Sequence, residues 1–158
     1  MEAVLFRKAD VADVSYLVEL RLQQLEEEGA EPTIDLRPAL TKYFKRSMND
    51  GSFVSWIAIC AGEIIATSGM SFSHKPPYYK NPTGYIGNLC NMYTLKEYRR
   101  KGIAKRLLGL VVDEAKAYGC GLVQITASDA GKHLYHSFGF RVHHKFMQYE
   151  VALEQKDA

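Results

Sequence analysis

EYRRKGIAKRLLGLV, residues 97–111, passes from a cluster of positive charge directly into the apolar face of a helix. Residues 85–94, YIGNLCNMYT, are typical of a strand, so the charged turn joins a strand to a helix. The first turn of a helix exposes unpaired N–H groups and carries a partial positive charge. Gly102 has no side chain to obstruct this backbone, and the basic residues at 99–101 raise the local potential. The stretch therefore predicts a site for an anion with several oxygens, such as a pyrophosphate.

Other phosphate-binding and nucleic-acid-binding explanations of this stretch fit less well. Neither GxxxxGK[ST] nor GxGxxG occurs in the chain, so it is neither a P-loop nor a dinucleotide fingerprint. The formal net charge of +2 is too small to indicate a polyanion partner, and Glu97, Asp113 and Glu114 lie close to the basic residues. We therefore expect no nucleic-acid partner.

Composition indicates a soluble cytoplasmic protein with one domain spanning residues 1–158. The hydrophobic share is 47% and the charged share 24%, as in ordinary globular proteins. No apolar run is long enough to span a bilayer and no signal peptide is evident, so we expect no membrane partner. Cys60, Cys90 and Cys120 are far apart and have no metal-ligand spacing, which indicates free thiols and no metal.

The order of elements predicts an α/β (α+β) sandwich with a mixed sheet and helices on both faces. Periodicity and turn residues indicate the order β-α-α-β-β-β-α-β-α-β-β, with a hairpin at Ala61-Gly62. The expected strands are residues 3–9, 53–72 as a pair, 85–94, a buried strand at 121–127, and one or two strands over 141–153. The first expected helix starts at the cap residue Asp10. Three further helices are expected at residues 36–48, 102–118 and 129–138.

Two blocks of the sequence resemble the GNAT superfamily of acyl-CoA-dependent N-acyltransferases. Arg99-x-x-Gly102-x-Ala104 fits the pattern (Q/R)-x-x-G-x-(G/A), between an apolar strand and an amphipathic helix. A strand and then LYHSFGF, residues 134–140, follow at the interval of the second conserved block of the family. The resemblance implies a mostly antiparallel central sheet in which one pair of strands is splayed apart.

The resemblance also implies how acetyl-CoA binds as a co-substrate. The pantetheine arm would lie in the slot between NMYT and VQITA, and the charged turn would hold the pyrophosphate. Ser128 and Gly131 stand where the family often has Asn and Ala; Ser128 would still cap the next helix and reach a cofactor amide. The implied cofactor-binding residues are Met92, Tyr93, Thr94, Arg99, Arg100, Lys101, Gly102, Ile103, Ala104, Lys105, Ser128 and Tyr135.

Tyr135 is the implied catalytic residue, as proton donor to the departing thiolate. A phenol with a pKa of about 10 is protonated at neutral pH, and its acidity is close to that of a thiol. A backbone N–H near Asn91 or Met92 would stabilise the oxyanion. The general base is left open among His74, Glu27, Glu28, Tyr93 and water, whereas His133 and His136 are expected to be solvated.

The expected activity is acetyl transfer to an amine of a small molecule by direct attack on the thioester. The stretches 25–36 and 74–84 are expected to determine acceptor specificity, with Tyr78 and Tyr79 as candidate walls. Glutamates at 26–28 would suit a cationic amine, although such a run is also typical of a solvated face. Acetylation of a protein amine and a non-catalytic acyl-CoA-binding module remain as alternatives. A homodimer is compatible with the sequence.

Overall fold

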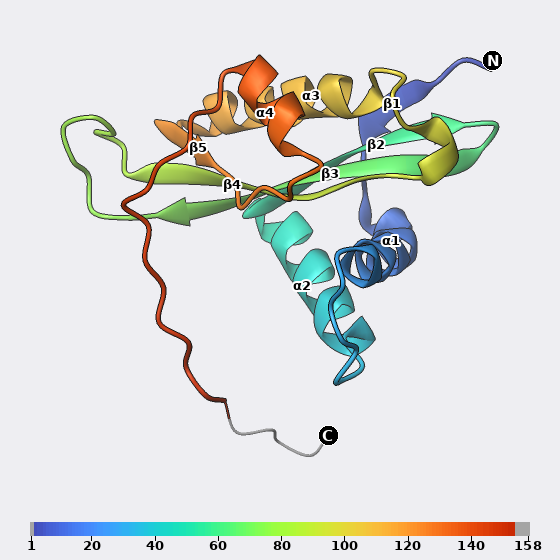
Figure 1. Cartoon of the computed structure of the whole chain (residues 1–158), viewed down its shortest axis with the longest axis horizontal. Helices are drawn as coiled ribbons and strands as arrows, with labels where there is room; N and C mark the ends of the chain where they lie inside the picture. The colour runs from blue at the N-terminus through green and yellow to red at the C-terminus, as the bar shows by residue number, and fades with distance from the viewer. Residues whose placement is uncertain (1, 154–158) are drawn as a thin grey trace.

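The computed structural model describes residues 2–153, which form one five-stranded sheet with helices on both faces (Figure 1). Helices α1 and α2 lie on one side of the sheet, and α3 and α4 lie on the other. The ends of the expected domain, residue 1 and residues 154–158, lie outside the described residues. The elements are β1 (Leu5–Lys8), η1 (Val11–Asp13), α1 (Val14–Glu27), α2 (Arg37–Asp50), β2 (Phe53–Cys60), β3 (Glu63–His74), β4 (Tyr85–Thr94), η2 (Lys96–Tyr98), α3 (Ile103–Tyr118), β5 (Leu122–Gln124) and α4 (Lys132–Phe138).

The strands lie side by side in chain order, β1-β2-β3-β4-β5. Each strand from β1 to β4 is antiparallel to the next: α1 and α2 lie in the connection from β1 to β2, whereas β2, β3 and β4 are joined by loops. The crossover through α3 makes β5 parallel to β4. The predicted mixed, mostly antiparallel sheet is therefore confirmed. Within the described residues, no helix is both long and apolar enough to cross a bilayer.

The first helical segment begins at the predicted acidic cap. The Asp10 side chain accepts a hydrogen bond from the Ala12 N–H, and the Asp13 carboxylate accepts one from the Asp10 N–H. Arg7 at the end of β1 donates two further bonds to Asp13, at 2.8 and 2.9 Å. This capping box therefore joins the start of α1 to the first strand.

Helix α3 packs the face that its periodicity predicts. Ile103, Leu107, Leu108, Val111 and Ala115 are all buried against the sheet. Tyr118 belongs to the predicted face but is half-exposed; its ring stacks on Phe72 at 4.0 Å between centroids. A continuous apolar stripe of this kind fixes the helix against the sheet and so fixes where its N-terminus lies.

Two predictions about the end of the chain are wrong. The strand expected to be buried at 121–127 is β5, which is short and only half-buried, because no described strand lies beyond it. Residues 141–153 pair with no described strand, and every one of them is exposed. The alternation of apolar residues is present in this segment, but a strand also needs a hydrogen-bonded neighbour, and no described strand pairs with these residues.

We expect Asp13→Ala to lower the free energy of unfolding by about 1–2 kcal/mol at pH 7, since a cap and charged hydrogen bonds are lost together. The hydrogen bonds from Arg7 hold the pKa of Asp13 below its ordinary value of 3.8. The stabilisation is thus complete above that value and is lost as the pH falls through the folded-state pKa. Urea unfolding at pH 7 and pH 3 measures this; a difference from the parent that does not shrink at pH 3 contradicts it. Asp129→Ala, at an exposed position, is the control and changes stability by less than about 0.5 kcal/mol.

Candidate functional site

Strand β4 loses its parallel partner halfway along its length. Its pairing with β5 runs only from Ile86 opposite Leu122 to Asn88 opposite Gln124. β4 continues to Thr94, still paired with β3 on its other side. The edge from Leu89 to Thr94 therefore faces no described strand, which is the splayed arrangement predicted at NMYT. Such an edge offers backbone groups to any extended molecule that lies along it.

A bulge at Asn91 bends β4 where the slot opens. Gly69 pairs with Cys90 and Thr67 pairs with Tyr93, so two residues of β4 oppose Ser68 alone. Asn91 has φ of 55°, a left-handed conformation that asparagine tolerates better than most residues. The Thr67 hydroxyl donates to the Asn91 carbonyl at 2.8 Å and holds the bulge in place. A bulge turns backbone groups out of the regular ladder, as an oxyanion-binding N–H requires.

Two side chains, one from α1 and one from the charged turn, donate to carbonyls of β4 at the slot. The Gln24 amide donates to the Met92 carbonyl at 3.1 Å, and the Arg99 Nε donates to the Thr94 carbonyl at 2.9 Å. Sequence reasoning missed Gln24, because nothing in the local pattern links α1 to a strand 68 positions further along. The end of α1 is therefore fixed against the slot.

Glu27 at the end of α1 is bonded both to β4 and to the charged turn. Its carboxylate accepts from the Tyr93 hydroxyl at 2.8 Å and from the Arg99 guanidinium at 2.7 Å. The bond from Arg99, and then that from Tyr93, lowers the pKa of Glu27; burial, followed by the Glu27 carboxylate, raises the pKa of Tyr93 to about 12. A carboxylate with a lowered pKa is a weak base, and a phenol with a raised pKa is hard to deprotonate. Neither Glu27 nor Tyr93 is therefore suited to act as the general base near neutral pH. The Arg99 side chain is therefore held by Glu27 and by the Thr94 carbonyl.

The charged turn has an open backbone at the start of α3. Gly102 precedes the helix with φ of +80°, and a Cβ built there meets nothing within 4 Å. Its carbonyl accepts the first bond of the helix, from the Arg106 N–H at 3.1 Å, and it supplies no side chain to the N–H groups that follow. Ile103 buries its side chain in the core, while Arg100, Lys101 and Lys105 are exposed. The described geometry is that of an unobstructed helix N-terminus surrounded by cations.

Tyr135 lies on α4 with its ring buried against the face of the sheet that α3 covers. The ring contacts Phe140 edge-on at 5.6 Å, and among the described residues none hydrogen-bonds to the hydroxyl, which is not sealed from solvent. Burial, and then the charge of Glu28, raises the pKa of Tyr135 to about 12. A protonated phenol is thus held rigidly with its donor available. Glu28, whose charge contributes to this shift, is the residue that follows α1.

Ser128 does not cap α4 as expected. Its hydroxyl accepts a bond from the Gly131 N–H at 3.3 Å, which closes a turn before the helix, and the cap residue itself is Gly131. Gly131 lies so close to Tyr135 that an added Cβ would be 2.8 Å from the ring. The glycine that departs from the family pattern therefore makes room for the ring.

The other titratable candidates lie away from the slot. His74 pairs with Tyr85 at the far end of β4, about 20 Å from Asn91 at roughly 3.3 Å a residue. It stacks on Tyr85 and its ring bonds the Thr83 carbonyl, so it belongs to the base of the 75–84 loop. His133 and His136 are exposed, as expected. No described group of His, Cys, Asp and Glu residues is arranged to hold a metal.

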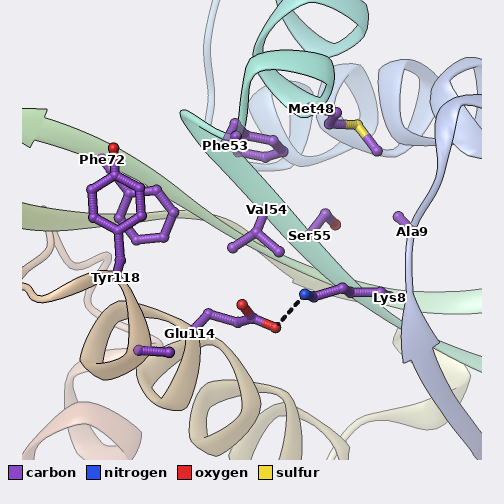
Figure 2. A pocket seen from close by; sticks show the side chains of 11 residues that line it. Lys8, Ala9, Met48, Phe53, Val54, Ser55, Phe72, Glu114 and Tyr118 are labelled. Atoms are coloured by element: carbon purple, nitrogen blue, oxygen red, sulfur yellow. Dashed lines mark ion pairs between the residues drawn. The ribbon is translucent and has the colours of Figure 1, made fainter.

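Two of the hollows in the described part of the chain bear on where a ligand could bind. One, of about 400 Å³, lies between the start of β2 and the last turns of α3, where Lys8 and Glu114 form an ion pair at 2.8 Å (Figure 2). Glu114 is about 18 Å along α3 from Gly102, so this hollow is remote from the charged turn. The second, of about 510 Å³, is lined by the end of α1 and the link to α2, including Leu25, Glu26 and Glu31. It lies on the same helix end as Glu27 and Glu28.

The chain is similar in sequence and in fold to known acetyltransferases. The Acetyltransferase (GNAT) family model matches residues 16–140. A predicted acetyltransferase of Clostridium acetobutylicum, crystallised with acetyl-CoA, is 38% identical, with 94% of this chain and 96% of that one covered and a TM-score of 0.90. A GCN5-related N-acetyltransferase of Ralstonia eutropha JMP134 is 19% identical, with 94% and 99% covered and a TM-score of 0.85. The aminoglycoside N-acetyltransferase AAC(6')-Iy is 18% identical, with 97% of each chain covered and a TM-score of 0.77. These last two show the shared fold alone, and among curated proteins no relative matches the chain.

We expect Gly131→Ala to lower the free energy of unfolding by about 1–3 kcal/mol, because the new methyl group must displace the Tyr135 ring. Gly109→Ala is the matched control: it lies within α3 with nothing within 4 Å of its Cβ, and alanine there stabilises by about 0.5–1 kcal/mol. Urea unfolding compares the two. Equal effects of both substitutions would contradict the close packing of Gly131 on the ring.

Proposed function

Since this chain belongs to the GNAT family of acetyltransferases, we propose that it transfers an acetyl group from acetyl-CoA to an amine of a small molecule. The observation that carries the proposal is the continuity of the parted β4 edge with the open N-terminus of α3 at Gly102. An extended arm that ends in a pyrophosphate fits such a path. The relative with 38% identity was crystallised with acetyl-CoA, which further supports this co-substrate.

In the proposed complex, backbone atoms of Met92, Tyr93 and Thr94 hold the pantetheine arm along β4. The turn from Arg99 to Lys105 holds the pyrophosphate through its N–H groups and exposed cations. The open space over Gly102 supports this placement, because a side chain there would fill it. Ser128 contributes from the turn before α4.

The acyl group arrives already activated as a thioester, so the chain need only position the amine and handle charge and protons. A covalent enzyme intermediate is not required, and the thiols of the chain do not favour one. Burial raises the pKa of Cys90 to about 11, so that it is a thiol rather than a nucleophilic thiolate. The N–H groups at the Asn91 bulge are the proposed donors to the developing oxyanion.

Tyr135 is the proposed proton donor to the departing sulfur. Its raised pKa keeps the phenol protonated over the whole neutral and alkaline range in which the protein would work. The same shift makes Tyr135 a weaker acid than an ordinary phenol. The proton is therefore not transferred before the C–S bond breaks; instead, the hydrogen bond from Tyr135 strengthens as the sulfur gains negative charge.

The acceptor is proposed to be a cationic amine that enters beside the end of α1. The hollow of about 510 Å³ is lined by apolar side chains, by the carboxylates of Glu26, Glu31 and Asp35, and by Arg37, and Glu28 lies at the same helix end. Carboxylates at this position would attract the protonated amine and leave its nitrogen near the slot. The cytoplasmic location expected from the sequence stays a prediction.

Thiol release from acetyl-CoA across a panel of polyamines, amino sugars and N-terminal peptides tests the proposed activity. We expect turnover with at least one cationic small amine. Gly102→Glu should weaken acetyl-CoA binding at least about 100-fold, because it adds both bulk and negative charge at the anion site. Gly109→Glu, which adds the same charge about 10 Å further along α3, is the matched control. Binding without turnover of any amine would instead indicate a non-catalytic acyl-CoA-binding module, and turnover of peptides alone a protein acceptor.

Tyr135→Phe should lower kcat by about 100-fold or more while it leaves the Kd for acetyl-CoA nearly unchanged, since only the proton donor is removed. Single-turnover kinetics separate the chemical step from product release. A chemical step at the parental rate would exclude Tyr135 as the donor.

A further inference from the structure

Thr67 in β3 is a buried polar residue whose side chain serves the neighbouring strand. The residue is 4% exposed, and Ala66 beside it is completely buried. Its hydroxyl donates to the Asn91 carbonyl of β4 at 2.8 Å. Valine is equally β-branched and would suit a buried strand without a polar atom to satisfy. The hydroxyl is therefore explained by the carbonyl that it holds rather than by the needs of its own strand.

The carbonyl that Thr67 holds lies where the ladder between β3 and β4 is interrupted. The described pairs pass from Cys90 opposite Gly69 to Tyr93 opposite Thr67, and they include neither Asn91 nor Met92. Asn91 is also in the left-handed conformation, with φ of 55°. Regular strand pairing thus does not fix the peptide group that joins Asn91 to Met92. The Thr67 hydroxyl takes over this task.

The direction of the Met92 N–H follows from the planarity of that peptide group. In a trans peptide the C=O of one residue and the N–H of the next point in opposite directions. The Asn91 carbonyl points at the Thr67 hydroxyl of β3, so the Met92 N–H points away from it. On that side β4 faces no described strand beyond Asn88. The Met92 N–H is therefore aimed at the slot in which the thioester would lie.

The next peptide group of β4 is held by a side chain of α1. Gln24 is 8% exposed, and its amide donates to the Met92 carbonyl at 3.1 Å. The amide oxygen of Gln24 accepts from the Arg21 guanidinium at 3.1 Å, so this buried side chain is satisfied at both ends. Side chains therefore hold the carbonyls on both sides of the Met92 N–H. A donor fixed in this way needs no reorganisation when negative charge develops on its acceptor.

We propose that Thr67 is a positioning residue for acetyl transfer: its hydroxyl holds the peptide group between Asn91 and Met92 so that the Met92 N–H points at the thioester oxygen. This inference rests on the proposed function, and it selects Met92 among the N–H groups of the bulge. Thr67 touches neither the substrate nor the reacting atoms and acts only through this peptide group. Without the hydroxyl the Asn91 carbonyl is free to turn, and the Met92 N–H turns with it because both belong to one plane.

Isotope-edited infrared spectroscopy of bound acetyl-CoA tests the direction of the N–H. The probe is acetyl-CoA with a heavy carbon isotope in its acetyl carbonyl, whose stretching band moves to lower frequency as the oxygen accepts a stronger hydrogen bond. In the parent protein we expect the band below that of free acetyl-CoA. Thr67→Val should lose most of this displacement, whereas Thr67→Ser keeps the hydroxyl and should retain it. The Kd for CoA, which has no acetyl oxygen, should be nearly unchanged in both variants.

Ser68→Ala is the matched control for the loss of a buried hydroxyl from β3. Ser68 is completely buried, but its hydroxyl donates to the Trp56 carbonyl of β2 at 3.0 Å and not to β4. The infrared band of bound acetyl-CoA should therefore stay at its parental frequency. Far-UV circular dichroism checks folding of every variant. If Thr67→Val does not fold, Thr67→Ala removes the same hydroxyl with a smaller side chain.

Single-turnover kinetics, with an amine that proves active in the panel above, give a second measurement. Thr67→Val should slow the chemical step about 10-fold or more with little change in the KM for acetyl-CoA, since an oxyanion donor acts mainly in the transition state. Ser68→Ala should keep the parental rate.

The outcomes separate this inference from the proposed function. A parent protein that does not bind acetyl-CoA would overturn the proposed function, and the role of Thr67 with it. Bound acetyl-CoA with an undisplaced band in the parent, or with the same displacement in Thr67→Val, would overturn the role of Thr67 alone. Equal effects of Thr67→Val and Ser68→Ala on the band would do the same, because they would show a general loss of packing in β3.

Discussion

The pairing between β4 and β5 stops after Asn88, and this interruption is the constraint on which the rest of the site depends. Continued pairing would consume the backbone groups of β4 that an extended ligand needs. The crossover through α3 makes β5 parallel, and the short β5 leaves the rest of β4 without a neighbour. The bulge at Asn91 lies within the unpaired stretch and directs its backbone out of the regular ladder.

An unpaired strand edge needs support, and here α1 supplies much of it. Gln24 and Glu27 at the end of this helix bond to the Met92 carbonyl and to the Tyr93 hydroxyl, and Glu27 also bonds to Arg99. One helix end is thus fixed to both the strand and the charged turn. The same helix end carries Glu26 and Glu28, which border the proposed acceptor side. Cofactor and acceptor regions therefore share a rigid element, as a transfer reaction between two bound molecules requires.

The two unfilled edges in this chain have different chemical character. The edge of β4 from Leu89 to Thr94 leads into the charged turn before Gly102, and it suits a ligand with a charged end and a polar arm. The outer edge of β5 has an exposed Leu122 and no cations of the charged turn beside it. In the proposed function, catalysis uses the edge of β4.

The sequence by itself determined most of the framework. The apolar stripe of α3, the charged turn before it and the acidic cap at Asp10 are local features, set by side chains a few positions apart, and they are present where predicted. Family resemblance located the parted strand and Tyr135, and the family is confirmed by the match over residues 16–140.

Tertiary structure alone decided how those parts are used. Arg99 looked like a phosphate ligand, but Glu27 and the Thr94 carbonyl engage its side chain. Gln24 gave no local signal, His74 proved remote, Ser128 closes a turn rather than capping α4, and the strand pattern of 141–153 found no partner in its own described chain. The physical reason is clearest for Gln24, for the bond between Arg99 and Glu27, and for residues 141–153. Periodicity records which face of an element is apolar, whereas a hydrogen-bond partner or a neighbouring strand is fixed only when segments far apart in the chain are brought together.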